Sequence, residues 1–275
     1  MFKYGLIGYP VKHSFSAAMH NAAFSYLNLD AKYELFELKP EQVAEFLSCL
    51  KNKNIRGLNV TIPHKEFALQ FLDEKSPEVE QIGAVNTICV TQQGKLKGFN
   101  TDCSGFLRHI SETGIAFKRA AIIGAGGAAK AVVIALLING INEIALYDID
   151  KSRSLCLAQR AGGFFPQCSI LVKDSISELK ILEKDILINA SGVGMKEEDV
   201  CIVSEQYLHK NLFVYDLIYN PAQTKLLKLA QQKGLKFSNG LKMLLYQGMQ
   251  AFELWTHQDA PLEIMFKALN EEVRK

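Results

Sequence analysis

A glycine-rich stretch in the middle of the chain constrains the fold more than any other feature. It reads Ala120-Ala-Ile-Ile-Gly-Ala-Gly-Gly-Ala-Ala129, and an apolar helical pattern follows it. A buried strand, a glycine turn and the start of a helix occur in this order in dinucleotide-binding domains. Gly124 permits the tight turn, Gly126 lets a pyrophosphate approach the backbone, and Ala129 permits close packing of the helix.

The turn and the start of the following helix form the predicted cofactor site. The first N–H groups of a helix have no partner within the helix, so they can bind phosphate groups. We therefore expect these residues to bind the cofactor: Gly124, Ala125, Gly126, Gly127 and Ala128. A turn with a purely structural role is the less favoured alternative.

Asp148 ends the next apolar run, at 144–147. An acidic side chain at this place can accept hydrogen bonds from the ribose 2′-hydroxyl of NAD and would repel the 2′-phosphate of NADP. This position predicts NAD as the preferred cofactor. Lys151 and Arg153 follow closely, and a basic side chain near this turn can pair with a 2′-phosphate, so NADP is not excluded. Solvated charges at the start of a helix are the favoured interpretation of both residues.

Strand-like and helical patterns alternate along the whole chain, which is typical of α/β proteins with mostly parallel sheets. The first part predicts strands at 4–7, 33–37, 57–62 and 85–90, and helices at 17–27, 40–51 and from Lys65 onward. The second part predicts strands around Ile122 and at 144–147, 186–189 and 213–216, and helices at 104–113, 128–139 and 152–160. Two more helices are predicted at 240–255 and 261–273.

The pattern changes near residues 102 and 239, and these changes predict two domains. The fold class is therefore α/β, with an N-terminal α/β substrate-binding domain and a Rossmann-like dinucleotide-binding domain. We expect residues 1–102 and 240–275 to form the first domain, to which the C-terminal helices return. Residues 103–239 are expected to form the second.

Composition and charge exclude several classes of protein. The chain is 48% hydrophobic and 22% charged, as in ordinary soluble globular proteins. The net charge is only +2, with no basic tract for nucleic acid. The longest apolar run, 131–138, is far shorter than the roughly 20 residues that cross a bilayer, and the N-terminus lacks a signal-peptide pattern. We expect a cytoplasmic protein without a membrane or nucleic-acid partner.

The cysteines point neither to a metal nor to a redox centre. All six are widely spaced, and none belongs to a C-x-x-C pair. We therefore expect no metal site, and we expect all six to be reduced residues that pack in the core.

Polar side chains within apolar, strand-like segments form the second strong signal. Asn59, Lys65, Asn86 and Asp102 lie in or directly after such segments. Burying an amide or a charge without a partner costs on the order of several kcal/mol. These residues therefore predict a shared polar pocket, and a small molecule as its ligand.

Several segments together carry a family resemblance. They are residues 5–16, 19–24, 59–65, 83–87, 98–102, 189–195, 215–221 and 239–247. In these segments the chain resembles the shikimate dehydrogenases, and the resemblance extends over nearly its whole length. It implies reversible, nicotinamide-dependent reduction of 3-dehydroshikimate to shikimate, a step in the biosynthesis of aromatic amino acids.

The resemblance also implies roles for individual residues. Lys65 and Asp102 would be the catalytic pair, because reducing a ketone requires a proton for the developing alkoxide. The implied substrate-binding residues are Ser14, Ser16, Asn59, Thr61, Lys65, Asn86, Asp102, Tyr219 and Gln247. The implied cofactor residues beyond the glycine turn are Ser191, Gly240 and Met243.

Some of these roles have structural alternatives. Ser14 and Ser16, which would hold the substrate carboxylate, could instead cap the helix that follows, because Ser is a preferred N-cap residue. Met243 could be a plain core residue. For His64, beside Lys65, a structural or surface role is the preferred interpretation.

One departure from the family pattern leaves other functions open. Members that use NADP usually carry Asn-Arg-Thr where this chain has Asp148-Ile149-Asp150. This segment is similar to NAD-using quinate/shikimate dehydrogenases of catabolic type, which are the alternative function, although Ser14 and Ser16 favour shikimate. A non-catalytic regulator on the same fold is the remote alternative. We expect a monomer or a homodimer.

Overall fold

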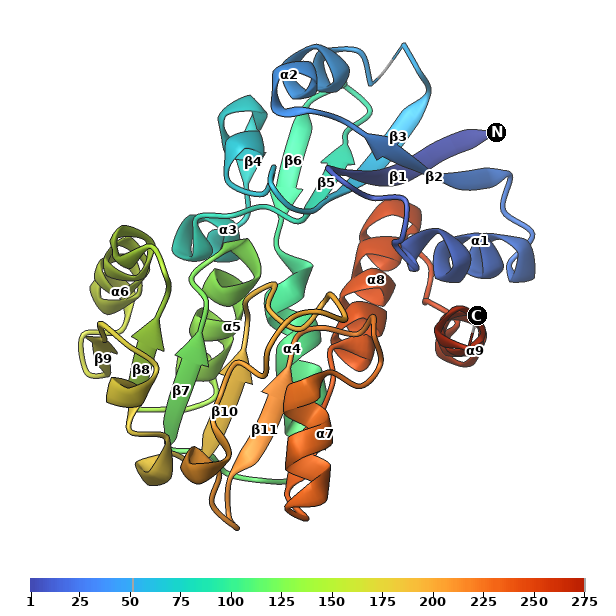
Figure 1. Cartoon of the computed structure of the whole chain (residues 1–275). Helices are drawn as coiled ribbons and strands as arrows, with labels where there is room; N and C mark the ends of the chain where they lie inside the picture. The colour runs from blue at the N-terminus through green and yellow to red at the C-terminus, as the bar shows by residue number, and fades with distance from the viewer. Residues whose placement is uncertain (51, 275) are drawn as a thin grey trace. The chain divides into compact units, whose positions relative to one another are not determined.

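The computed structural model describes residues 1–50 and 52–274, which divide into two compact units (Figure 1). The first unit comprises Met1–Gly105 and the chain from Leu244 onward, and the second comprises Phe106–Met243. The chain enters the second unit within α4 (Thr101–Ser111) and leaves it within α8 (Leu241–Thr256). The domain limits expected from the sequence, after residues 102 and 239, stay a prediction.

Six strands form the sheet of the first unit, in the order β2-β1-β3-β5-β6-β4. Their bounds are β1 (Phe2–Gly8), β2 (Ala31–Glu37), β3 (Ile55–Val60), β4 (Glu74–Lys75), β5 (Thr87–Val90) and β6 (Leu96–Phe99). Strand β1 pairs in parallel with β2 and β3, and β4 pairs in parallel with β6. Strand β5 runs antiparallel to both of its neighbours, β3 and β6. This reversal places the end of β3 beside the start of β5.

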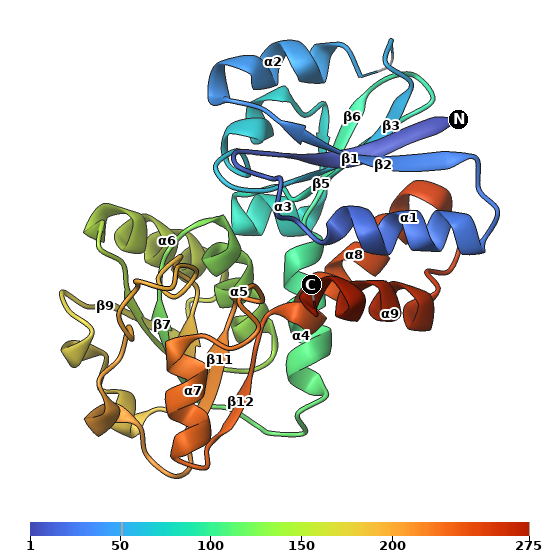
Figure 2. The same ribbon diagram turned by 45° about the vertical axis from the view of Figure 1, so that its right-hand side comes forward.

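Both faces of this sheet are covered by apolar side chains. The helices of the unit are α1 (Ser16–Tyr26), α2 (Pro40–Ser48), α3 (Pro77–Ile82), most of α8, and α9 (Leu262–Val273), with η1 (Phe67–Phe71) as a 3-10 turn. Helices α1 and α9 lie side by side (Figure 2). An aromatic cluster surrounds the ring of His20 and consists of Phe24, Tyr33, Phe252 and Trp255.

The sheet of the second unit is entirely parallel, in the order β12-β11-β10-β7-β8-β9 (Figure 1). Its strands are β7 (Arg119–Ile123), β8 (Glu143–Tyr147), β9 (Ser169–Val172), β10 (Ile186–Asn189), β11 (Phe213–Asp216) and β12 (Lys236–Ser238). This is the strand order of a doubly wound dinucleotide-binding sheet. The predicted α/β fold class is confirmed.

Helices α5 (Gly127–Ile138), α6 (Lys151–Phe164) and α7 (Lys225–Gln232) connect the strands of the second unit. Every residue of α5 from Ala129 to Leu137 is buried, which explains why all of them except Lys130 are apolar. Helix α7 packs against β11 and β12 (Figure 2). Three 3-10 turns complete the unit: η2 (Ser177–Leu179), η3 (Ile181–Glu183) and η4 (Glu205–Tyr207).

The helix expected from Lys65 onward is wrong. Lys65 lies in a turn, and only the 3-10 turn η1 follows it. The backbone explains the difference, because the carbonyl of Lys65 accepts a hydrogen bond from Val85 N at 2.8 Å instead of one from its own segment. The predicted helix 40–51 ends at Ser48, and its last expected residue, Lys51, lies outside the described residues.

Three further findings concern the described residues as a set. Within 1–50 and 52–274, no helix combines the length and the apolar character that crossing a membrane requires. The same residues contain no cluster of three or more side chains suited to hold a metal ion. All six cysteines are free, but Cys156 is exposed, so the expectation that all six pack in the core is wrong for this residue.

Candidate active site

Lys65 and Asp102 form an ion pair in the first unit, through Lys65 Nζ and Asp102 Oδ2. Lys65 comes from the turn after β3, and Asp102 from the first turn of α4. Their side chains are only 12% and 9% exposed. Because little water surrounds the pair, the attraction between the charges is stronger than in an exposed surface pair.

Asn86 holds the other oxygen of the Asp102 carboxylate. The backbone N–H of Thr101 donates to Asn86 Oδ1 at 2.7 Å, so the amide nitrogen must face the opposite way. Asn86 Nδ2 donates to Asp102 Oδ1 at 2.8 Å and to Gln247 Oε1 at 3.3 Å. Both carboxylate oxygens of Asp102 are therefore bonded, and its orientation is fixed.

Asn59, on β3, extends this cluster away from the ion pair. Its Nδ2 donates to the backbone oxygen of Asn86 at 3.3 Å and to Thr87 Oγ1 at 3.1 Å. Its Oδ1 accepts a hydrogen bond of 2.7 Å from the Tyr33 hydroxyl. The structure thus joins five predicted site residues in one cluster: Asn59, Lys65, Asn86, Asp102 and Gln247. Their roles stay predictions.

Tyr33 and Thr87 belong to the same cluster, but sequence reasoning did not identify them. Both side chains are buried, at 1% and 0% exposure. Thr87 directly follows Asn86 within a strand, so it could have been found as one more polar residue in an apolar segment. Tyr33 offered no such signal, because a tyrosine in a strand is ordinary.

Ser14 and Ser16 form a separate pair. Ser14 Oγ donates to Ser16 Oγ at 3.2 Å and accepts from Ser16 N at 3.3 Å. Phe15 occupies the N-cap position of α1 and makes no side-chain cap, but Ser14 Oγ accepts from the N–H of the first helical residue, so the helix-cap alternative stays open for Ser14. Thr61 follows β3, and its backbone N–H donates to Ile7 O at 2.9 Å. No hydrogen bond within the described residues joins these three side chains to the Asn59–Asp102 cluster.

His64 has a structural role in this geometry. Its side chain is buried, and its Nε2 lies 2.7 Å from the backbone oxygen of Leu38. This contact agrees with the structural interpretation of His64 and leaves Lys65 as the polar residue of the turn that faces the cluster.

The glycine turn of the second unit fits the pyrophosphate of a dinucleotide. Gly124 has a φ angle of +108°, and a Cβ there would lie 2.7 Å from the carbonyl carbon and oxygen of Ala190. Only glycine adopts this conformation and fits this space. Gly126 is the N-cap of α5, so the unpaired N–H groups of the first helical turn follow directly.

Asp148 and Arg153 both lie next to this turn. Asp148 Oδ2 accepts from Ala125 N at 2.6 Å, and Oδ1 accepts from Asp150 N at 2.9 Å. The Asp148 carboxylate therefore ties the glycine turn to the loop after β8. The Arg153 guanidinium lies over the turn, with Nη2 3.5 Å from the point that a Cβ on Gly126 would occupy. Lys151 is ion-paired with Asp174.

The remaining predicted cofactor residues lie in loops of the second unit and at the start of α8. Ser191 donates through Oγ to Asn189 Oδ1 at 2.6 Å. Gly240 has no room for a side chain, because a Cβ there would overlap the Leu217 carbonyl. Met243 is buried. Tyr219, which is predicted to bind the substrate, is half-buried in the loop after β11. The assigned roles of these residues stay predictions.

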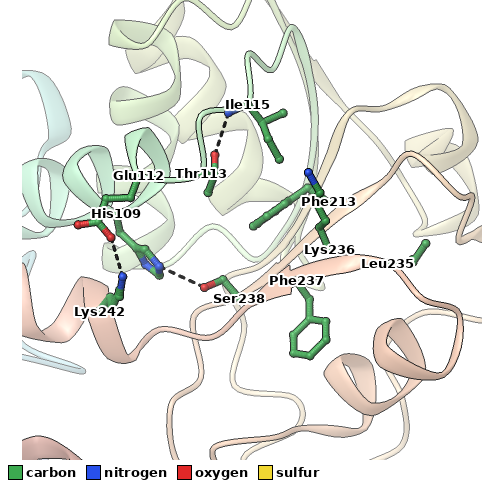
Figure 3. Close-up of a pocket in the computed structure, with 10 residues that line it drawn as sticks. All are labelled: His109, Glu112, Thr113, Ile115, Phe213, Leu235, Lys236, Phe237, Ser238 and Lys242. Carbon is green, nitrogen blue, oxygen red and sulfur yellow. Dashed lines mark hydrogen bonds and ion pairs between the residues drawn. The ribbon is translucent and has the colours of Figure 1, made fainter.

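The second unit also contains a cavity of about 460 Å³, which Figure 3 shows. None of the predicted site residues lines it. In its wall, His109 Nε2 lies 3.1 Å from Ser238 Oγ, and Nδ1 lies 2.7 Å from the Tyr215 hydroxyl. Burial, with a smaller effect of the Lys242 charge, lowers the pKa of His109 to about 4. The neutral imidazole thus ties α4 to β11 and β12.

Together, these features define the class of the protein. A doubly wound parallel sheet with a glycine turn, in a chain whose other unit holds a partly buried Lys–Asp pair, is the arrangement of a nicotinamide-dependent dehydrogenase. Comparisons with known proteins agree. Residues 6–88 match the shikimate dehydrogenase substrate binding domain, and residues 240–269 match the shikimate 5′-dehydrogenase C-terminal domain.

Similar proteins were found over the full length. A shikimate dehydrogenase (NADP(+)) from Methanopyrus kandleri is 42% identical over 278 residues, which cover 98% of this chain and 95% of the relative. A crystal structure of a shikimate dehydrogenase in complex with NADP+ gives a TM-score of 0.92 at 36% identity, covering 100% of this chain and 96% of that one. A shikimate 5-dehydrogenase from Thermus thermophilus, in complex with NADP(H) and shikimate, gives 0.88 at 35% identity, covering 99% and 100%. The chain belongs to the shikimate dehydrogenase family.

The prediction that NAD is the preferred cofactor is wrong. Three curated relatives at 40–42% identity are NADP(+) enzymes, and two of the similar structures contain NADP. In the structure both oxygens of Asp148 accept hydrogen bonds from backbone amides, so this carboxylate has a structural role beside the glycine turn. Arg153, which the sequence favoured as a solvated charge, lies over the glycine turn, where a cation favours a phosphate.

Proposed function

We propose that this protein catalyses the reversible reduction of 3-dehydroshikimate to shikimate with NADP as its cofactor. The observation that carries the proposal is the Lys65–Asp102 pair, which belongs to a buried hydrogen-bonded cluster in the unit that contains the match to the substrate binding domain. When bound, the nicotinamide ring supplies the hydride for the carbonyl carbon in one direction and accepts it in the other.

Lys65 is the proton donor in this proposal. As a ketone is reduced, negative charge develops on its oxygen and needs a proton. The Lys65 ammonium can deliver that proton, and the neutral amine can take it back in the reverse direction. Asp102, fixed by Asn86, holds the Lys65 Nζ in one place, so that the group does not have to be positioned during the reaction.

Hydroxyl and amide groups bind the substrate in this proposal. Ser14 and Ser16 hold the carboxylate of shikimate as neutral donors. The ring hydroxyls are bound by amide and hydroxyl side chains of the first unit, namely those of Asn59, Thr61, Asn86 and Gln247. Support comes from the cluster in which three of these four side chains already meet.

The cofactor is held by the glycine turn and by Arg153. Gly124 and Gly126 leave room for the pyrophosphate at the N-terminus of α5. The Arg153 guanidinium, beside the same turn, pairs with the 2′-phosphate of NADP. Gly240 and Met243 approach the nicotinamide ring, where a missing side chain permits close backbone contact.

The first test is a set of initial rates for the purified protein. Shikimate and quinate are each paired with NADP and with NAD. We expect the highest kcat/KM for shikimate with NADP. Faster turnover of quinate would instead support the quinate dehydrogenase alternative. Cofactor binding without turnover of either acid would support the regulator. Light scattering of the same sample checks the expected monomer or homodimer.

The second test isolates Lys65. Lys65→Ala should lower kcat by about 100-fold or more, because general acid–base groups contribute on the order of 10²–10⁴, while KM for shikimate changes little. Lys97→Ala is the matched control, since Lys97 is a half-exposed lysine of the same unit that is ion-paired with Glu74. A rise in KM with an unchanged kcat would show that Lys65 only positions the substrate.

A further inference from the structure

The orientation of two active-site amides can be read directly from the structure. Backbone N–H groups only donate, and backbone carbonyls only accept, so a bond to either one assigns the O and N of an amide. Thr101 N donates to Asn86 Oδ1 at 2.7 Å. Asn59 Nδ2 donates to Asn86 O at 3.3 Å. The amide oxygens and nitrogens of Asn59 and Asn86 are therefore assigned independently of each other.

The Thr87 hydroxyl connects these two amides. Thr87 Oγ1 accepts from Asn59 Nδ2 at 3.1 Å and donates to Asn86 Oδ1 at 3.0 Å. Tyr33 begins the series, since its hydroxyl donates to Asn59 Oδ1 at 2.7 Å. Asn86 Nδ2 ends it on Asp102 Oδ1 at 2.8 Å. The hydrogen bonds thus run in a single direction from Tyr33 to the carboxylate that holds the catalytic lysine.

The start of this series is held rigidly. The backbone of Tyr33 is bonded on both sides to the Asn21 amide, which donates to Tyr33 O at 3.0 Å and accepts from Tyr33 N at 2.8 Å. The Tyr33 ring stacks on the His20 ring, with 4.5 Å between centroids and 6° between planes. Thr87 lies opposite Asn59 in the register of β5 with β3. Neither hydroxyl can move far without breaking the core around it.

We propose that Tyr33 and Thr87 are positioning residues of the dehydrogenase reaction. Their hydroxyl groups hold the amides of Asn59 and Asn86, and Asn86 in turn holds Asp102 against Lys65. This inference rests on the proposed function, because it acts through residues that are assigned there to substrate binding and catalysis. Tyr33 and Thr87 contribute through these residues and not by contacting the substrate.

The two hydroxyls have different expected effects. Removing the Tyr33 hydroxyl leaves one amide oxygen, Asn59 Oδ1, without its donor, and Asn59 is assigned to a substrate hydroxyl. Removing the Thr87 hydroxyl takes an acceptor from Asn59 Nδ2 and one of three donors from Asn86 Oδ1, whose other donors are Thr101 N and Thr101 Oγ1. The change reaches Asp102 through Asn86. Loss of Tyr33 OH should therefore appear mainly in KM for shikimate, and loss of Thr87 OH should appear in kcat as well.

The test compares Tyr33→Phe, Thr87→Val and Thr87→Ser in the full-length protein. Tyr33→Phe should raise KM for shikimate about fivefold, and Thr87→Val should lower kcat about tenfold, as expected for groups that lose a buried hydrogen bond. Thr87→Ser keeps the hydroxyl and should recover most of that loss. The KM for NADP should stay within about twofold throughout, which separates misplaced substrate groups from general damage to the fold.

Tyr4→Phe is the matched control. Tyr4 is buried in the same aromatic cluster and stacks on Trp255 at 5.2 Å. Within 1–50 and 52–274 its hydroxyl makes no hydrogen bond to another residue, and it is not one of the buried polar atoms left without a partner. The inference is overturned when Tyr33→Phe and Thr87→Val both match Tyr4→Phe in kcat and KM, or when Thr87→Ser is as impaired as Thr87→Val. An unsubstituted protein that does not turn over shikimate overturns the proposed function itself.

If Thr87→Val fails to fold, Tyr33→Phe against Tyr4→Phe decides the result alone, because both variants remove a single tyrosine hydroxyl, and the Tyr4 ring packs against Phe24 and Trp255 of the aromatic cluster. A raised KM for shikimate in Tyr33→Phe only supports the inference. Equal values in the two variants overturn it.

Discussion

Acidification should destabilise the first unit through His20. The ring of His20 is fully buried, and neither of its nitrogens has a hydrogen-bond partner among the described residues. This burial lowers the pKa of His20 from 6.5 to about 3. The folded protein therefore keeps His20 neutral below pH 6.5, whereas the unfolded chain takes up a proton. Stability from this group is present above pH 6.5 and is lost as the pH falls toward 3.

The size of the effect follows from the difference in pKa. One pH unit within this window corresponds to about 1.4 kcal/mol of unfolding free energy. Lowering the pH from 6.5 to 4.5 should therefore remove roughly 2 kcal/mol, a large part of the roughly 5–15 kcal/mol that stabilises a typical domain. His109, with a pKa lowered to about 4, acts in the same direction, and Asp216, raised to about 6, acts in the opposite one.

A variant isolates the contribution of His20 from those of the other groups. Urea unfolding is followed at pH 7, 6 and 5 through the fluorescence of Trp255, the single tryptophan, which lies against the His20 ring. The stability of the unsubstituted protein minus that of His20→Leu should fall by roughly 2 kcal/mol between pH 7 and pH 5. Phe24→Leu, a non-titrating change in the same cluster, should give a constant difference. A constant difference for His20→Leu as well would refute the reasoning.

Three further predictions concern the second unit. Arg153→Ala should raise KM for NADP about tenfold or more and leave KM for NAD nearly unchanged, as steady-state rates would show; equal changes for both cofactors would exclude a contact with the 2′-phosphate. Gly124→Ala should weaken cofactor binding in calorimetry and lower the melting temperature more than Gly114→Ala, whose Cβ would meet nothing within 4 Å; similar shifts would contradict the overlap with Ala190. Thr224→Val removes a 2.7 Å hydrogen bond to Asp216 and should cost about 1–3 kcal/mol in urea unfolding; an unchanged free energy of unfolding would contradict this prediction.

The second unit could be predicted well, because its strands are short apolar runs between turn residues. The expected strands at 186–189 and 213–216 coincide with β10 and β11. Such strands are buried on both faces by the crossover helices, so the apolar signal is continuous and its ends are sharp. The glycine turn is equally local as a sequence signal, since its glycines and the start of the following helix lie within a few consecutive residues.

Short elements and long-range hydrogen bonds could not be predicted. The edge strands β9 and β12 are only four and three residues long and partly exposed, so they carry little periodicity. The helix expected from Lys65 onward was wrong for a different reason. The carbonyl of Lys65 accepts a hydrogen bond from Val85, which lies on a distant segment of the chain. Asp148 also bonds to a distant segment. Its position at the end of a strand suggested a contact with the ribose of the cofactor, whereas its carboxylate accepts a hydrogen bond from Ala125 N.

The candidate site was predicted in its residues but not in its connections. Amides and charges in apolar segments identified Asn59, Asn86 and Asp102, because each one had to find a partner. The partners of Asn59, for example, are Tyr33 and Thr87, which lie 26 and 28 positions away from it in the sequence. No pattern along the chain reports such a pair, since only the pairing of strands brings its members together.

The return of the chain to the first unit has a consequence for the order in which the protein is made. A ribosome completes the second unit once Met243 has been added, whereas the first unit, although begun earlier, still lacks α9 and most of α8. Until Trp255 has been synthesised, its indole ring cannot pack against Gly57, and the hydrogen bond from Trp255 Nε1 to Ile88 O cannot form. The aromatic core of the first unit therefore cannot be completed until α8 and α9 have emerged from the ribosome.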